Sequence, residues 1–392
     1  MTRAPREFEY VVVGLGGIGS AAAYWLSRQA GASVLGLERF DTGHGNGASE
    51  DHSRIVRRSY HTPGYVRLTA DAFGAWAQVE AEADERLILR TGGLDLFPEG
   101  AAIPAADYTD SMSVCGVPFE EMDGGEAMRR WPQWRLDDAV KVLYQSEAGI
   151  AAASRCNATH RRLAVAHGAT LRDRTRVTGL RDADGEVDVI VEGGGAVRCR
   201  KAVLAVDAWT NELLEPLGVR LPLTITQEQV VYLRAPDAGA FDPERFPIWI
   251  WMDDPSFYGF PAFGEPGPKV AQDVGGRPVS PAGRTFDADP DALRRVMAFV
   301  ERHLPRAHGP VLRLQTCLYT LTPDRDLVVD AVPGHPSVLV ALGAAHGFKF
   351  ASLLGRVLAD LAVTGRSAVD LEAFRLDRPI LRMEDPPTGF LV

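Results

Sequence analysis

One stretch near the N-terminus constrains the fold of this chain more than any other. The apolar run Tyr10–Val13 is followed at once by the glycine-rich turn Gly14–Gly19 (GLGGIG). The pattern of Ser20–Gln29 predicts a helix, and a second apolar run, Ser33–Leu37, ends at Glu38. Strand, turn, helix, strand and acid therefore follow one another in the order of a dinucleotide-binding βαβ unit.

Each glycine of the G-x-G-x-x-G pattern in this turn has a physical task. Gly14 permits the sharp turn after the strand, Gly16 lets the backbone approach a pyrophosphate, and Gly19 lets the helix pack closely on the sheet. The free N–H groups at the helix N-terminus attract phosphate. Glu38 can accept hydrogen bonds from ribose hydroxyls, and its charge would repel a 2′-phosphate. We expect FAD or NAD here; a glycine-rich turn without a ligand remains the alternative.

Length and composition narrow the class of protein. A chain of 392 residues exceeds the usual size of one core, so two domains are expected. The net charge of −10 argues against a nucleic-acid partner. The sequence has neither a membrane-spanning apolar run nor the apolar core of a signal peptide, so we expect a cytoplasmic protein. The scattered cysteines suggest no disulfide framework and no metal site; they are Cys115, Cys156, Cys199 and Cys317.

The order of the apolar patterns predicts a mixed α/β (α+β) chain of two domains. A Rossmann-like nucleotide-binding domain is expected from residues 1–88, 150–220 and 320–392. Residues 89–149 and 221–319 are expected to form a substrate-binding domain on a mostly antiparallel sheet, with the active site between the domains. The patterns predict helices at 64–86, 153–167 and 289–303, and strands at 170–180, 224–233, 248–260 and 311–319.

The segment after Glu38 is rich in glycine, asparagine, serine and charge. It predicts a loop that becomes a helix near Ser53, which would place Arg54 and Arg57 on one helical face. Two cations beside a nucleotide fold can clamp a phosphate or a substrate carboxylate. A solvated basic face is the alternative.

Five short motifs occur along the chain: Gly14–Gly19, Asn46–Arg57, Tyr258–Phe263 with Lys269, Cys317–Pro323 (CLYTLTP) and His346–Phe350 (HGFKF). In this order the sequence resembles the monomeric sarcosine oxidase and N-methyltryptophan oxidase family, within the FAD-dependent amine oxidases. The resemblance covers nearly the whole chain, and the last two motifs are the most specific.

The resemblance implies an FAD joined to Cys317 by an 8α-S-cysteinyl thioether. Such a link requires a thiol beside the flavin ring and a basic environment that lowers its pKa. From composition alone, Cys317 would be a small buried apolar residue. The implied cofactor-binding residues are Gly14, Gly16, Gly19, Glu38, Arg39, Ser49, Arg54, Val177, Cys317, Gly347, Phe348 and Lys349.

The resemblance also implies roles in substrate binding and catalysis. Lys349 and Arg57 match the pair that binds the substrate carboxylate, which needs cations because a buried anion alone is costly. Arg54 matches an arginine on the flavin face, and Lys269 a lysine that promotes the reaction with O2, since both would stabilise developing negative charge. Tyr319 matches an active-site tyrosine. From pattern alone, Lys269 would be an ordinary loop lysine and Tyr319 a core aromatic residue.

Three departures from the family pattern concern the active site. The family usually has two histidines and a glycine where this chain has Ser49–Asp51, so Glu50 replaces an active-site histidine. Asp273 replaces another, and Asp207 stands where the family commonly has glycine. We therefore include Glu50 among the catalytic candidates and Asp273 among the substrate-binding ones, because an acid there could hold an ammonium group or assist its proton loss.

The resulting expectation is an oxidase of a secondary α-amino acid or related amine, of the sarcosine or N-methyl amino acid type. It would oxidise a C–N bond to an imine and reduce O2 to H2O2, as a monomer without a membrane or nucleic-acid partner. An FAD oxidase or dehydrogenase of a cyclic imino acid, such as proline or pipecolate, or of a biosynthetic tailoring intermediate is the alternative. A non-enzymatic flavoprotein is the third possibility.

Overall fold

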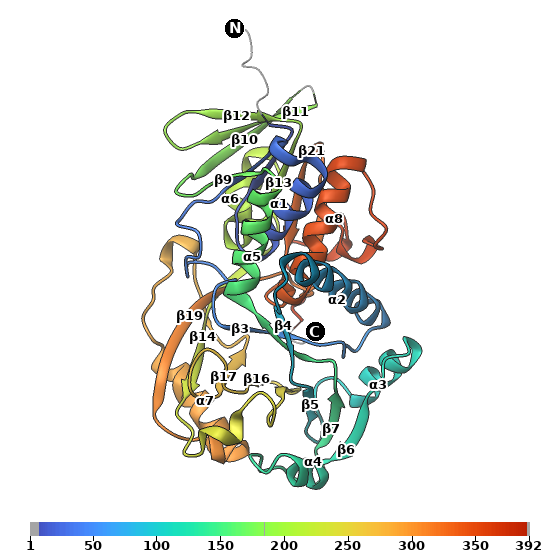
Figure 1. Ribbon diagram of the computed structural model, residues 1–392, viewed down its shortest axis with the longest axis vertical. Helices are drawn as coiled ribbons and strands as arrows, with labels where there is room; N and C mark the ends of the chain where they lie inside the picture. Colours follow the sequence, from blue (N-terminus) through green and yellow to red (C-terminus); the bar gives the residue numbers. More distant parts are fainter. Residues whose placement is uncertain (1–7, 184, 390–392) are drawn as a thin grey trace.

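A six-stranded sheet forms the upper half of the molecule in the computed structural model, which describes residues 8–183 and 185–389 (Figure 1). Its order is β20-β21-β13-β1-β2-β9, and every neighbouring pair is parallel except β20 with β21. The strands are β1 (Tyr10–Val13), β2 (Val34–Leu37), β9 (Thr170–Arg172), β13 (Lys201–Leu204), β20 (Val328–Val332) and β21 (His335–Leu342). The predicted nucleotide-type sheet is thus present, built from three separate parts of the chain.

Both faces of this sheet are covered, which explains why β1 is apolar throughout. Tyr10 and Val12 belong to the core beneath the helices, whereas Val11 and Val13 belong to the core on the other face. The helices are α1 (Gly17–Ala30), α5 (Ala153–Ala166) and α8 (Ala351–Thr364). The opposite face carries a three-stranded antiparallel sheet of β10 (Val177–Ala183), β11 (Glu186–Val191) and β12 (Ala196–Cys199).

Helices α1 and α8 come from opposite ends of the chain and pack very closely. A Cβ atom added at Gly355 of α8 would lie 2.6 Å from the Cβ of Ala21 in α1. Trp25 on α1 also donates a hydrogen bond to the hydroxyl of Ser352 on α8 (3.2 Å). Because Gly355 has no side chain, helices α1 and α8 can pack in direct contact.

A nine-stranded, mostly antiparallel sheet forms the lower half (Figure 1). Its order is β18-β14-β17-β16-β15-β5-β7-β6, and β19 also pairs with β14. The strands are β5 (Gly93–Phe97), β6 (Glu120–Asp123), β7 (Lys141–Gln145), β14 (Thr224–Leu233), β15 (Ile248–Trp251), β16 (Ser256–Phe260), β17 (Lys269–Asp273), β18 (Arg277–Pro278) and β19 (Val311–Leu321). Helix α7 (Pro290–His303) packs its apolar side, including Val296 and Phe299, against Trp249 of this sheet.

The expected α/β class is confirmed, and so are the helices at 64–86, 153–167 and 289–303, which are α2 (Pro63–Ala83), α5 and α7. Two of the predicted strands are each two separate strands in the structure. The stretch 248–260 forms two antiparallel strands, β15 and β16, and 170–180 is shared between two sheets. The other α-helices of the described residues are α3 (Ala105–Val114), α4 (Gly124–Arg130) and α6 (Thr210–Leu214).

The prediction of a helix near Ser53 is wrong. Residues Ser53–Val56 form strand β3, which pairs antiparallel with β8 (Gly149–Ala152); β8 also pairs with β4 (Ile88–Arg90). The β-branched Ile55 and Val56 suit a strand. The strand forms because it pairs with β8, which lies almost a hundred residues away in the sequence. Arg54 and Arg57 consequently do not share a helical face.

Among the described residues, no helix is long and apolar enough to cross a bilayer. The proposed division into two domains at residues 89, 150, 221 and 320 stays a prediction. What the fold supplies to function is the junction between the two large sheets.

Candidate active site

A cavity lies at this junction, where the carboxyl ends of β1, β2, β13 and β21 face strands of the nine-stranded sheet. Its lining extends from the glycine turn at Gly14 to Cys317 on β19 and Lys349 before α8. In open α/β sheets, the crevice at the carboxyl ends of the strands is the usual ligand site. The cavity is therefore the place to examine each predicted site residue.

The glycine turn has the shape that a diphosphate needs. Gly14 adopts φ +88°, and a Cβ there would lie 2.5 Å from the carbonyl oxygen of Ala205. A Cβ at Gly19 would lie 1.8 Å from the carbonyl oxygen of Gly14, so Gly19 packs under the turn and does not line the cavity. Helix α1 begins at Gly17 without a side-chain cap, and its N-terminus faces the cavity, where it can bind phosphate.

A loop residue and an aromatic ring complete this cradle. Gly17 donates its N–H to the Ser49 hydroxyl (2.9 Å). A Cβ at Gly16 would lie 3.1 Å from that hydroxyl, and one at Gly17 would lie 3.2 Å from the ring of Phe348. Side chains at these glycines would therefore fill the space in front of the helix, which fits the diphosphate of FAD.

Glu38 closes one end of the cavity. Its carboxylate accepts hydrogen bonds from the N–H groups of Leu15 (2.8 Å) and Phe40 (3.1 Å) and lies 3.1 Å from the His44 imidazole. Burial alone would raise the pKa of Glu38, but the hydrogen bonds from His44 and Leu15 outweigh it and lower the pKa. The group is thus an ionised acceptor, suited to ribose hydroxyls. Arg39 lies at the same end of the cavity.

Cys317 lies on β19 with its side chain buried at the cavity wall. Burial raises the pKa of Cys317 to about 11, although the Arg54 guanidinium opposes this shift. The expected acidic thiol is therefore not present in the protein by itself. The thiol nevertheless shares one cavity with the glycine turn, as an attachment to FAD would require.

Two tyrosines line the cavity close to this cysteine. The hydroxyl groups of Tyr319 and Tyr258 lie 3.3 Å apart, and burial raises the pKa of both. They are therefore neutral hydrogen-bonding groups over the whole physiological range. Tyr319 is the predicted one; Tyr258 was noted only within its motif.

Arg57 and Lys349 also line the cavity, but their surroundings differ. The Arg57 guanidinium donates to Asp95 (3.2 Å) and lies over the ring of Tyr60. Lys349 is buried in the turn Gly347–Phe350, and its ammonium donates to the carbonyl oxygen of His346 (3.1 Å). Within the described part of the chain, no ion pair joins Lys349 to a carboxylate. Burial, helped by Arg57, lowers the pKa of Lys349 well below its usual value.

Asp273 and Glu50, the acids that replace family histidines, both line the cavity and have partners in the protein. Asp273 accepts a hydrogen bond from the buried Arg325 (3.0 Å). Glu50 accepts one from Asn157 (3.1 Å) and lies 3.8 Å from Arg161. Each acid is therefore held in place before any substrate binds.

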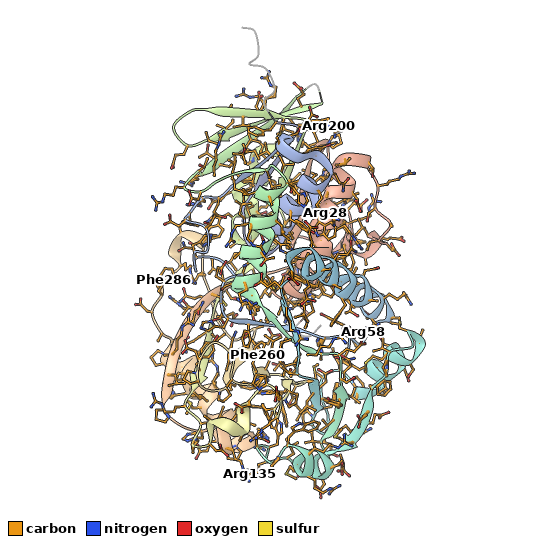
Figure 2. All side chains as sticks on the ribbon, viewed as in Figure 1. Arg28, Arg58, Arg135, Arg200, Phe260 and Phe286 are labelled. Atoms are coloured by element: carbon orange, nitrogen blue, oxygen red, sulfur yellow. The ribbon has the colours of Figure 1, made fainter. Side chains whose placement is uncertain are left out.

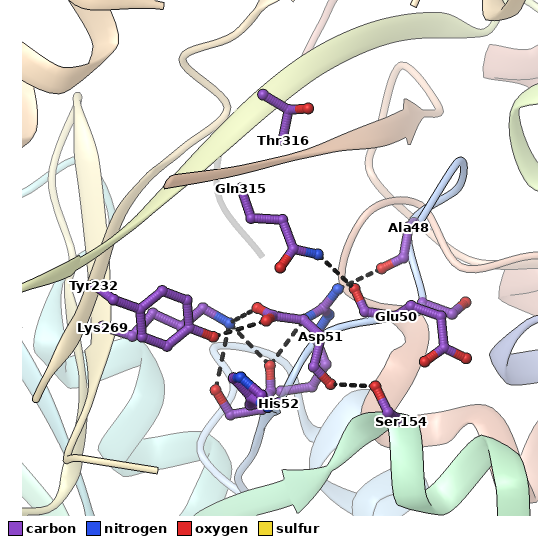
Figure 3. A network of polar contacts seen from close by, with 12 residues as sticks. Ala48, Glu50, Asp51, His52, Ser154, Tyr232, Lys269, Gln315 and Thr316 are labelled. Atoms are coloured by element: carbon purple, nitrogen blue, oxygen red, sulfur yellow. Dashed lines mark hydrogen bonds and ion pairs between the residues drawn. The ribbon is translucent and has the colours of Figure 1, made fainter. Parts of the chain in front are cut away.

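Lys269 is the predicted residue whose position differs most from expectation. It does not line the cavity; its ammonium lies behind Asp51, 2.5 Å from that carboxylate (Figure 3). The ring of Phe260, which Figure 2 labels in the interior of the molecule, lies 4.7 Å from the ammonium and does line the cavity. Arg54, by contrast, lines the cavity and donates to the carbonyl oxygens of Ala48 (2.6 Å) and Ser53 (2.8 Å).

The departure at Asp207 also reaches the cavity. Asp207 adopts φ +47°, a conformation that glycine favours, and its Oδ2 atom is buried without a hydrogen-bond partner among the described residues. Burial raises the pKa of Asp207 to about 6. A strained, titratable carboxyl group thus stands beside the glycine turn.

Most of the predicted residues meet in this one cavity, although they come from distant parts of the sequence. Those that line it are Gly14, Gly16, Glu38, Arg39, Ser49, Glu50, Arg54, Arg57, Val177, Asp273, Cys317, Tyr319, Gly347, Phe348 and Lys349. Sequence reasoning missed the parts played by Asp51, Asp95 and Arg325. A charge inside the apolar strand GLDLF was a usable signal for Asp95, whereas nothing local distinguished Arg325.

Comparisons with known proteins agree with this architecture. Residues 9–361 match the family model described as FAD dependent oxidoreductase. Monomeric sarcosine oxidase from Streptomyces avermitilis is 34% identical over 94% of this chain and 96% of its own. N-methyl-L-tryptophan oxidase from Salmonella arizonae is 28% identical over 95% and 99%. The solved open form of NikD, described as an unusual amino acid oxidase essential for nikkomycin biosynthesis, is 28% identical with a TM-score of 0.83 over 99% of both chains.

The family match covers the glycine turn, the cavity and the cysteine strand alike. The chain therefore belongs to the FAD-dependent oxidoreductase family and is an amine oxidoreductase of the sarcosine oxidase type, acting on CH–NH bonds.

Proposed function

We propose that this protein is a flavin-dependent oxidase of a secondary α-amino acid or related amine, converting the C–N bond to an imine and O2 to H2O2. The environment of Lys349 is the main support for this proposal. It is a buried amine at the cavity wall with no carboxylate of the described chain in ion-pair distance. A substrate carboxylate would supply the missing counter-ion and thereby raise the pKa of Lys349 again.

The chain would contribute positioning and electrostatics. FAD, when bound, supplies the group that accepts hydride equivalents from the carbon beside the amine nitrogen. Lys349 would bind the substrate carboxylate, and Arg57, which Asp95 holds in place, would add positive charge to the same cavity wall. The neutral hydroxyls of Tyr258 and Tyr319 bound the space where the amine would lie. Arg54 places a permanent positive charge at the same wall, where negative charge would develop.

We further propose that FAD is joined covalently to Cys317. The thiol must lose its proton for this, and Arg54 is the group that favours the thiolate most against burial. In that case the yellow colour stays with the polypeptide after acid precipitation. The Cys317→Ser variant would release its flavin into the supernatant, and free flavin from the unaltered protein would contradict the linkage.

The substrate class is tested by anaerobic bleaching of the flavin with N-methyl and cyclic amino acids. Lys349→Met should raise the KM for a carboxylate-bearing substrate about 100-fold, because the buried ion pair is lost. The exposed Lys141 provides the matched control, and Lys141→Met should leave the KM unchanged. Equal KM values for Lys349→Met and the unaltered protein would contradict the assigned carboxylate site.

A second candidate is an oxidase or dehydrogenase of a cyclic imino acid or of a biosynthetic tailoring intermediate. It is favoured by the similarity to NikD over almost the whole chain and by the acids Glu50 and Asp273 at histidine positions. Bleaching by proline or pipecolate in preference to sarcosine would select it. One H2O2 per turnover distinguishes an oxidase from a dehydrogenase. We expect a monomer acting in the cytoplasm, which size-exclusion chromatography and cell fractionation test.

A further inference from the structure

Asp51 occupies the centre of a buried polar network that the proposed reaction does not explain (Figure 3). It lies where the resembling family usually has glycine. One carboxylate oxygen accepts from the Lys269 ammonium (2.5 Å), and the other accepts from the Tyr232 hydroxyl (2.7 Å). Its side chain is 2% exposed, as is that of Lys269. The Asp51 carboxylate therefore forms a direct ion pair with a lysine that lies just behind the cavity wall.

Strands β3, β14 and β19 contribute polar or charged groups around Lys269, and β16 contributes the neutral ring of Phe260. Strand β3 contributes Arg54, whose guanidinium is 3.4 Å from Asp51 and disfavours a second cation. Strand β14 contributes Tyr232, whose pKa burial raises, so it is neutral. Strand β19 contributes Cys317 and, 3.8 Å from Asp51, the guanidinium of Arg313. Burial would raise the pKa of Asp51, but the charges of Lys269 and Arg54 outweigh it and lower the pKa, so Asp51 is ionised.

The Asp51 carboxylate favours the charged form of the buried lysine. Burial lowers the pKa of Lys269 to about 8, with Asp51 opposing the shift and Arg54 adding to it. The ammonium also donates to the backbone and hydroxyl oxygens of Ser53 (3.0 and 3.3 Å), but neutral acceptors compensate a buried charge poorly. Loss of the carboxylate would leave the buried lysine beside the Arg54 guanidinium without a counter-ion, and the lysine would give up its proton first.

We propose that Asp51 is a positioning residue for flavin reoxidation: it holds Lys269 as an ammonium behind the cavity wall and so extends that reaction to higher pH. In this reaction O2 takes two electrons and one proton from the reduced flavin (FADH⁻) and a second proton from solvent, and becomes H2O2. A nearby cation favours the first electron transfer because it stabilises the developing superoxide charge. The proposal rests on the proposed function only for O2 as the acceptor, not for the amine.

The test therefore avoids the amine. The flavin is reduced by dithionite or light and mixed with O2 in a stopped-flow instrument between pH 6 and 10. The unaltered protein should reoxidise fast at low pH and slow down near pH 8. In Asp51→Asn the decline should move at least one pH unit lower, so that the rate at pH 8 is at least fivefold below that of the unaltered protein. At pH 6 the variant should equal or exceed it.

Three further variants separate this role from a purely structural one. Lys269→Met should be slow and independent of pH. Asp51→Glu keeps a carboxylate and should retain the decline near pH 8. Tyr232→Phe keeps the ion pair and should leave the profile in place. Asp51→Gly, with the residue that the resembling family has, repeats the test if the asparagine variant does not fold.

The outcomes distinguish the two proposals. An unchanged pH profile in Asp51→Asn, or a rate lowered by one factor at every pH, overturns the role of Asp51. An unaltered protein that amines bleach but that shows no pH-dependent reoxidation also overturns it, while amine oxidation stands. A pH-dependent reoxidation without bleaching by any amine leaves Asp51 in its role and refutes the proposed substrate class.

Discussion

The carboxyl group of Asp207 gives a stability prediction whose size follows from the structure. Its pKa rises from 3.8 to about 6 because the group is buried. The folded protein therefore binds this proton more tightly than the unfolded chain, and the free energy of unfolding falls as the pH rises from about 4 to 7. A shift of about 2 units amounts to about 3 kcal/mol in total, of which about 2 kcal/mol falls between pH 4.5 and 7.5.

Two variants isolate this contribution. Asp207→Asn keeps the shape, tolerates the left-handed backbone and cannot ionise. Asp207→Gly also removes the strain of φ +47°, which is worth about 1 kcal/mol. Relative to the unaltered protein, both should therefore gain stability on going from pH 4.5 to 7.5, and glycine should be the more stable of the two.

Differential scanning calorimetry of the flavin-free protein, prepared from riboflavin-limited cells, measures the effect. A chain of 392 residues has an unfolding entropy of about 0.8 kcal/mol/K, so about 2 kcal/mol corresponds to a Tm change of about 2.5 °C. The Tm of Asp207→Asn minus that of the unaltered protein should increase by this amount between the two pH values. A constant difference would refute the reasoning, because it would mean that Asp207 keeps an ordinary pKa when folded.

Three other variants test separate parts of the site. Lys269→Met should slow reoxidation by O2 at least about tenfold and change anaerobic reduction by an amine less than twofold; equal slowing in stopped-flow traces would contradict the lysine's role. Gly19→Ala should abolish flavin incorporation, measured from absorbance, because its Cβ would meet a carbonyl oxygen at 1.8 Å, whereas Gly74→Ala, which meets nothing within 4 Å, should not. Asp95→Asn should destabilise the protein by about 3 kcal/mol in thermal unfolding, because Arg57 loses the carboxylate it contacts; an unchanged Tm would show that the pair is dispensable.

The parts that the sequence predicted well are those that neighbouring residues decide. The turn Gly14–Gly19 carries its whole geometry in six positions, and the apolar spacing of α2 and α7 is enough to identify them as helices. Strand β3 was missed because its pairing with β8 outweighs the local signal of two arginines. The chain before and after that strand gives no information about the partner.

The chemistry of the site divides in the same way. The cavity-lining positions of Cys317 and Lys349 followed from short motifs. The contact of Lys269 with Asp51 could not be inferred, because 218 residues separate the two. The residues around each of them contain no signal for such a long-range contact. The raised pKa of Cys317 was missed for a related reason, since burial depends on the assembled sheets rather than on the residues beside it.

The close packing of α1 against α8 through Gly355 has a consequence for how the protein is made. The glycine turn Gly14–Gly19 is synthesised long before Gly347–Phe350, although both segments line the same cavity. A nascent chain that has not reached Phe350 therefore lacks part of the cavity wall. Flavin uptake is expected only from a polypeptide that extends at least through α8.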